Sequence, residues 1–171
     1  MDEKLTVKQV GIRYGIYLAI IAIIYTTLLQ IMNMAANQSL GYISYIFVII
    51  AIILAHRDYK KSNEFMSYGQ GISISMISIT ISTVVSTIFM YLYIKFIDNS
   101  MLELIKQQSE AKMQQRGMSD EQVEQAMAIS SKFMTPEMIL VFGILGGLLI
   151  GFIISLIITA ITKKTAPEIP V

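Results

Sequence analysis

The sequence predicts an all-α integral membrane protein of four transmembrane helices, with an extracytoplasmic helical hairpin between the third and the fourth. Of its 171 residues 54% are hydrophobic and only 15% charged, and the mean hydropathy is +0.62, which is more apolar than an average soluble domain. The apolar residues form long runs that one long polar segment, residues 98–136, interrupts. Such a segment cannot lie within a bilayer. We therefore expect a single membrane domain, residues 1–171, with three spans before the polar segment and one after it.

The first span is predicted over residues 11–34, because about twenty apolar residues cross the hydrocarbon core of a bilayer. Thr6 and Gln9 have the spacing of a capping box at its entry. The basic residues near the amino end would also suit a signal peptide. The apolar run nevertheless continues to the end of this range and no small-residue cleavage site follows it, which favours an uncleaved helix.

The second span is predicted over residues 41–55, which is short for a crossing helix and would equally suit a buried or re-entrant segment. Tyr42 and Tyr45 at one end and His56 and Arg57 at the other have the character of interfacial anchors. These flanks favour a full crossing, followed by a basic connector over residues 56–64.

The third span, residues 71–97, begins with an alternation of isoleucine and serine that is typical of a β-strand. A lone strand cannot satisfy its backbone in lipid, so a helix is expected. Four serines then share one helix face and predict close packing and hydrogen bonding to a neighbouring helix, although a polar pathway is an alternative use. This serine stripe consists of Ser75, Ser78, Ser82 and Ser86.

The polar segment, residues 98–136, reads as two amphipathic helices joined at Gly117. Ser100 with Glu103 and Ser119 with Gln122 supply a capping signal for each helix. The two apolar stripes either bury each other or form a methionine-rich surface for a partner. The candidate partner-binding residues on these stripes are Met101, Ile105, Val123 and Met127.

The fourth span, residues 137–162, follows an N-cap and a first-turn proline, Thr135 and Pro136. Within it small residues recur every four positions and form a ladder along one helix face. Such a ladder packs helices closely, either inside the bundle or between two copies of the chain, and both alternatives stay open. The ladder consists of Gly143, Gly147, Gly151 and Ser155, and Thr159 continues it.

Charge predicts the orientation. With four spans, eight of the 13 Lys and Arg residues share one side, namely Lys4, Lys8, Arg13, Arg57, Lys60, Lys61, Lys163 and Lys164. On the other side acidic residues outnumber basic ones. By the positive-inside rule both termini are cytoplasmic and the hairpin lies outside. The expected location is the inner (plasma) membrane, as a multi-pass protein.

Little of the chemistry that enzymes use is visible. The chain has no cysteine and one histidine, His56, which we interpret as an interfacial residue beside Arg57. No Asp, Glu, Lys or Arg lies in the middle of a span, which argues against a proton-coupled transporter. We expect no catalytic, cofactor-binding or metal-binding residues. The net charge of +1 and the scattered basic residues give no indication of nucleic-acid binding.

From residue 59 to residue 164 the order of features resembles a domain-of-unknown-function family, the one numbered forty-one ninety-nine, of small bacterial inner-membrane proteins. The residues that carry the resemblance are Tyr68-Gly69-Gln70-Gly71, Gly117-Met118-Ser119, Phe133-Met134-Thr135-Pro136 and Lys163-Lys164. The resemblance implies the same four-helix layout and brings no catalytic residues.

The function predicted from the sequence is association in the cell envelope, without enzymatic activity, through the hairpin and the glycine-rich last helix. The expected partners are the lipid bilayer and either a second copy of the chain or another membrane protein. The alternative is a small transport or channel subunit that uses the third helix. An intramembrane enzyme would need a base beside a nucleophile, and only His56 offers a histidine base.

Overall fold

The computed structural model describes residues 4–35 and 37–166 and is all-helical within them, with a single isolated β-bridge between Met66 and Lys164. Four long helices are each long and apolar enough to cross a membrane. They are α1 (Val7–Ile31), α2 (Gln38–Asn63), α3 (Tyr68–Phe96) and α6 (Pro136–Thr162). Between α3 and α6 lie α4 (Ser100–Gln115), α5 (Asp120–Ser130) and a 3-10 turn (Ser131–Phe133). The all-α class and the four apolar helices are as predicted.

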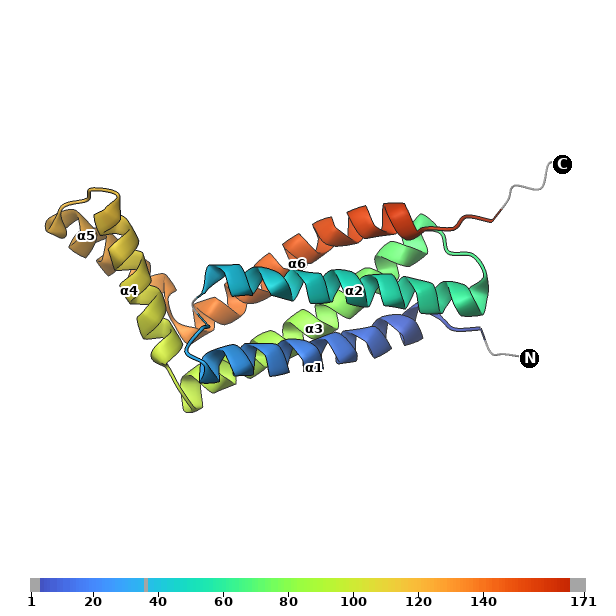
Figure 1. Ribbon diagram of the computed structural model, residues 1–171, viewed down its shortest axis with the longest axis horizontal. Coiled ribbons are helices and arrows are strands. Elements are labelled where there is room, and N and C mark those ends of the chain that lie inside the picture. Colours follow the sequence, from blue (N-terminus) through green and yellow to red (C-terminus); the bar gives the residue numbers. More distant parts are fainter. Residues whose placement is uncertain (1–3, 36, 167–171) are drawn as a thin grey trace.

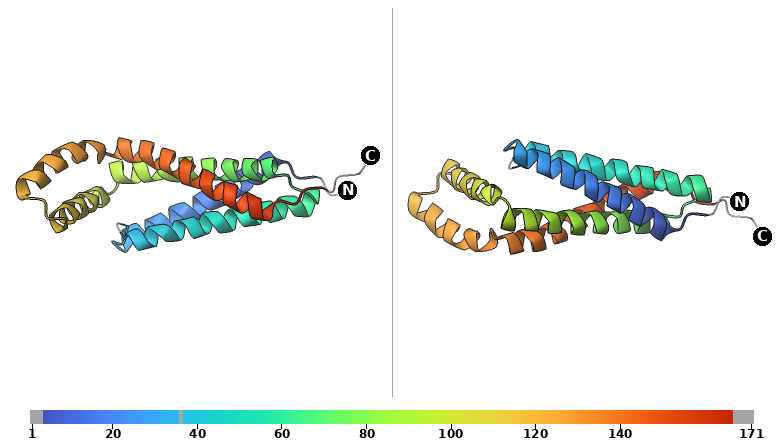
Figure 2. Two further views of the ribbon diagram at one scale, coloured as in Figure 1. Left: turned by 90° about the horizontal axis from the view of Figure 1, so that it is seen from above. Right: turned by 90° about the horizontal axis from the view of Figure 1, so that it is seen from below.

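The long helices form an elongated bundle with two different ends (Figure 1). At the terminal end α1 begins and α6 ends, and at the distal end α4 and α5 project beyond the bundle. Within the bundle α1 packs on α2 and α3, and α3 packs on α6. Toward the distal end α2 and α6 move apart, as both views of Figure 2 show.

Side-chain caps define most helix starts. Reciprocal capping boxes are present at Thr6 for α1 and at Ser119 for α5, and Thr135 caps α6, as the sequence predicted. A third capping box, Ser67 with Gln70, starts α3 and was not among the predicted signals, although its spacing is readable. Gly117 ends the turn after α4 with φ +80, a conformation that glycine adopts without strain.

The capping signal predicted for Ser100 and Glu103 is wrong. The N-cap of α4 is Asn99, which makes no side-chain cap bond. The backbone N–H of Ser100 donates to the Asp98 carboxylate at 2.8 Å, and the Ser100 hydroxyl donates to the same carboxylate at 2.9 Å. These bonds, the backbone one first, hold the pKa of the Asp98 carboxyl below its usual value. An aspartate two residues upstream therefore replaces the serine as the group that orders this helix start.

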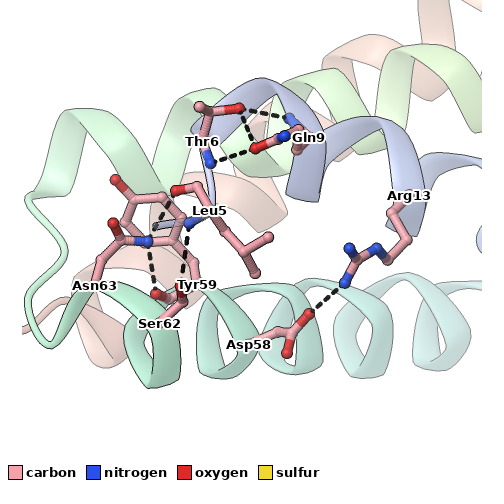
Figure 3. Close-up of polar contacts among 8 residues, drawn as sticks. All are labelled: Leu5, Thr6, Gln9, Arg13, Asp58, Tyr59, Ser62 and Asn63. Atoms are coloured by element: carbon pink, nitrogen blue, oxygen red, sulfur yellow. Dashed lines mark hydrogen bonds and ion pairs between the residues drawn. The ribbon is translucent and has the colours of Figure 1, made fainter. Parts of the chain in front are cut away.

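The predicted end of the second span also differs, because α2 continues through the expected connector, residues 56–64, to Asn63. Its last turns are held by distant parts of the chain (Figure 3). The Asn63 amide donates to the Leu5 carbonyl at 2.9 Å, and the Leu5 N–H donates to the Ser62 hydroxyl at 3.1 Å. Arg13 forms an ion pair with Asp58 at 3.1 Å. The short span is therefore a full-length helix of 26 residues.

Candidate functional site

The serine stripe of α3 faces other helices. Ser75 and Ser78 are fully buried and Ser82 is 6% exposed, whereas Ser86 is half-buried. The Ser78 hydroxyl lies 3.0 Å from the Gly11 carbonyl oxygen of α1 and 2.9 Å from the Ile74 carbonyl oxygen in its own helix. A hydroxyl that links two helices requires close backbone approach, and the small residues of α1 permit it.

The glycines of the ladder on α6 face α3. A Cβ placed on Gly143, Gly147 or Gly151 would lie 3.1, 2.8 or 2.5 Å from a methyl carbon of α3, on Thr87, Thr83 and Ile79 respectively. Each glycine thus occupies a position where a larger residue would push the two helices apart. The small-residue face of α6 is therefore in contact with α3 of the same chain.

The candidate partner-binding residues lie on helices that the rest of the chain covers only in part. No residue of α4 is buried, and Val123 is the only buried residue of α5. Met101, Ile105 and Met127 are half-buried. Ile129, near the end of α5, is 63% exposed. The apolar stripes are therefore only partly covered within the described chain.

His56 lies at the centre of a buried polar network that ties three helices together at the terminal end. Its side chain is fully buried, so the interpretation of His56 as an interfacial anchor is wrong. Nδ1 is 2.7 Å from the Thr162 hydroxyl of α6, and Nε2 is 2.9 Å from the Gly71 carbonyl oxygen of α3. Nε2 is also 2.9 Å from the Ser75 hydroxyl. Beside the network, Lys60 Nζ donates to the Thr162 carbonyl oxygen at 2.7 Å.

Both ring nitrogens of His56 have partners on neighbouring helices. The Ser75 hydroxyl donates to the Gly71 carbonyl oxygen at 2.9 Å, and the same oxygen lies 2.9 Å from Nε2. The partner of Nδ1 is the Thr162 hydroxyl, which donates to the Ile158 carbonyl oxygen at 2.7 Å. The arrangement also brings a histidine base beside a serine hydroxyl, a pair that the sequence did not place together. Both side chains have no exposed surface, so no substrate reaches the Ser75 oxygen in this conformation.

Two more buried hydroxyls lie on α6 near the same end. The hydroxyl oxygens of Ser155 and Thr159 are fully buried and have no hydrogen-bond partner among the described residues. The Thr159 methyl group approaches Gly71 so closely that a Cβ there would lie 2.5 Å away. The helices α3 and α6 therefore pack closely at this crossing, and the two hydroxyls are left without hydrogen-bond partners there.

A cavity of about 330 Å³ lies between the helices on the distal side of this crossing. All four long helices line it, with Leu18 and Ala22 from α1, Phe47 and Val48 from α2, and Ile150 and Ile154 from α6. From α3 it receives the hydroxyl-bearing residues Ser82, Thr83, Ser86 and Thr87. None of the described residues that line it carries a charge.

Among the residues that the structure describes, no group of three or more His, Cys, Asp or Glu side chains could hold a metal ion. A family model described as "Protein of unknown function (DUF4199)" matches residues 13–164. No curated protein matches the chain, and no solved structure matches it.

Proposed function

Since the chain belongs to the DUF4199 family of proteins of unknown function, we propose a function from its own structure: association with another protein of the bacterial inner membrane, without catalysis, through α4 and α5. In this proposal the two helices form a hairpin on the outer side. The glycines of α6 contribute less to association than the sequence suggested, because they contact α3.

The proposed orientation rests on the distribution of charge over the two ends. The terminal end carries Lys60, Lys61, Lys163 and Lys164, whereas α4 and α5 carry an acidic excess. Basic residues are retained on the cytoplasmic side of inner-membrane proteins. The terminal end is therefore cytoplasmic and the hairpin extracytoplasmic in this proposal.

The observation that carries the proposal is the incomplete cover of two amphipathic helices. Short isolated helices are marginally stable in water, and most of their stability in proteins comes from burying an apolar face. Here α4 buries no residue and α5 buries only Val123. A partner that covers Met101, Ile105 and Met127 would supply the missing contact, and methionine surfaces adapt to such partners.

The test is photocrosslinking in the native membrane from a photoreactive residue at Met127, followed by mass identification of the captured protein. A matched control places the same residue at the exposed Gln125, about 200° around the helix from Met127. Capture of one distinct protein from Met127 and not from Gln125 supports the proposal. Capture of the chain itself points to a homo-oligomer. Loss of stability alone in Val123→Ala and Met127→Ala indicates that the hairpin only packs on itself.

A second candidate function is a small transport or channel subunit, favoured by the hydroxyls of α3 that line the cavity. A water-filled path would make a cysteine at Ser82 reactive toward a membrane-impermeant thiol reagent. Ser78 gives the matched control, because its hydroxyl is bonded to the Gly11 carbonyl and is fully buried. Equal protection of both cysteines would refute transport through this path.

A further inference from the structure

We infer that the cavity between the four long helices is a binding site for an uncharged lipid, one with a hydrocarbon body and a hydrogen-bond-accepting carbonyl. This site is independent of the association surface on α4 and α5. Its volume of about 330 Å³ falls in the range of small-molecule sites, which extend from about 300 to 1,000 Å³.

The walls determine the body of the ligand. The residues of α1, α2 and α6 that meet there are mainly aliphatic and aromatic, for example Leu18, Phe47 and Ile154. The lining of α3 extends from Ile79 to Met90, within the middle and distal parts of a helix that runs from Tyr68 to Phe96. The cavity therefore lies at a depth where the surrounding solvent is hydrocarbon, and a hydrocarbon chain fills it without loss of hydrogen bonds to water.

The hydroxyls of α3 determine the polar group. Ser82 is 6% exposed, lines the cavity, and its hydroxyl makes no hydrogen bond within the described residues. The hydroxyls of Thr83 and Thr87, which also line the cavity, likewise lack a partner there. By contrast, the Ser86 hydroxyl donates to the Ser82 carbonyl at 2.7 Å. Ser82 is buried, and Thr83 and Thr87 are half-buried. Hydroxyls away from water are ordinarily hydrogen-bonded, so these three lining hydroxyls favour a ligand that carries an acceptor such as a carbonyl oxygen.

The absence of charged residues from the described lining indicates that the ligand is uncharged. A phosphate or carboxylate at this depth would need a cationic partner, and none of the lining residues is charged. The terminal end is closed by the contacts of His56 with Thr162 and Gly71, so entry is from the distal side, where α2 and α6 move apart (Figure 2). An uncharged lipid such as a diacylglycerol combines a mobile hydrocarbon chain with ester carbonyls.

The experiment uses the full chain in phosphatidylcholine vesicles that contain a diacylglycerol with a photoactivatable group in one acyl chain. Labelled peptides are mapped by mass spectrometry, and unlabelled diacylglycerol is added as competitor. We expect label on the α1 and α3 peptides that carry Ala22 and Ser82, and we expect the competitor to remove it. Label on the exposed outer face of α6 reports bulk lipid and is not saturable.

Two variants and one control locate the site. Ala22→Phe fills the cavity and is expected to abolish the saturable label, whereas the same substitution at the exposed Ala160 leaves it unchanged. Ser82→Ala is nearly isosteric and serves as the second variant in case Ala22→Phe prevents folding. It is expected to weaken the binding of the competing diacylglycerol about two- to tenfold, the effect of one lost hydrogen bond.

Three results would overturn the inference. The first is label that the competitor does not remove. The second is equal competition by added phosphatidylcholine, which would mean simple exposure to bulk lipid. The third is rapid reaction of a cysteine at Ser82 with a membrane-impermeant reagent, because a water-filled path would replace the lipid site.

Discussion

Replacement of His56 by alanine tests whether the buried network holds the terminal end together. The imidazole has no exposed surface and contacts Thr162 on α6 as well as Gly71 and Ser75 on α3. The substitution removes both ring nitrogens and leaves a void between three helices. Ser75 and Thr162 retain bonds to carbonyl oxygens of their own helices, so they are not orphaned.

The expected loss has two parts. Each of the two ring-nitrogen bonds contributes about 0.5–1.5 kcal/mol, with values near 0.6 kcal/mol typical between membrane helices. The side chains around the void lose dispersion contacts, because the packed helices cannot move in to fill it. Large-to-small changes in packed cores cost about 2–5 kcal/mol. Because the transfer part of that cost is small in lipid, we expect His56→Ala to lower the free energy of unfolding by about 2–4 kcal/mol.

The assay is reversible unfolding in mixed micelles of mild detergent and dodecyl sulfate, followed by circular dichroism. Arg57→Ala is the matched control, since the neighbouring side chain is exposed, and it is expected to change stability by less than about 0.5 kcal/mol. His56→Gln retains one hydrogen-bonding amide and should fall between the two. A loss below about 1 kcal/mol for His56→Ala would refute the role of the network, given the magnitudes for buried bonds and voids.

Three further substitutions are measured in the same way. Gly151→Ala should destabilise by about 1–3 kcal/mol because its Cβ would lie 2.5 Å from a methyl carbon of Ile79, and an unchanged stability would mean that α3 and α6 separate freely. Gly146→Ala on the same helix, where a Cβ meets nothing within 4 Å, should be neutral or stabilise by up to about 1 kcal/mol. Glu64→Gly should stabilise by about 1 kcal/mol, because Glu64 has φ 69 and ψ −45, which glycine adopts without strain; a loss would show that its side chain matters more than its backbone.

The features that the sequence predicted correctly are those that neighbours along the chain determine. Long apolar runs identified the four helices that are long and apolar enough to cross a membrane, and spacing within one turn identified the caps at Thr6, Ser119 and Thr135. The predicted capping signal at Ser100 was wrong because the Asp98 carboxylate, two residues away, accepts the Ser100 N–H. The predicted end of the second span was wrong because the Asn63 side chain bonds to the Leu5 carbonyl oxygen, which is far away in the sequence.

The burial of His56 was missed for a related reason, although a signal was present. Ile52, Ala55, His56 and Tyr59 have the spacing of one helix face, and all four are buried. Because this spacing continues past residue 55, the predicted end of the span, it would have placed His56 on the buried face of α2. Its partners, 15 and 106 positions further along the chain, could not be read from the sequence.

The two ends of the bundle differ because different kinds of side chain meet there. At the terminal end hydrogen bonds between helices and close contacts at Gly71 bring α2, α3 and α6 together. Toward the distal end the hydroxyls of α3 have no partners on α2, and small lining residues such as Ala22, Ser44 and Gly147 leave a cavity between the helices. Movement of the helices is therefore expected to pivot about the His56 network. A ligand that fills the cavity would act on the separation of α2 and α6 at the end that carries α4 and α5.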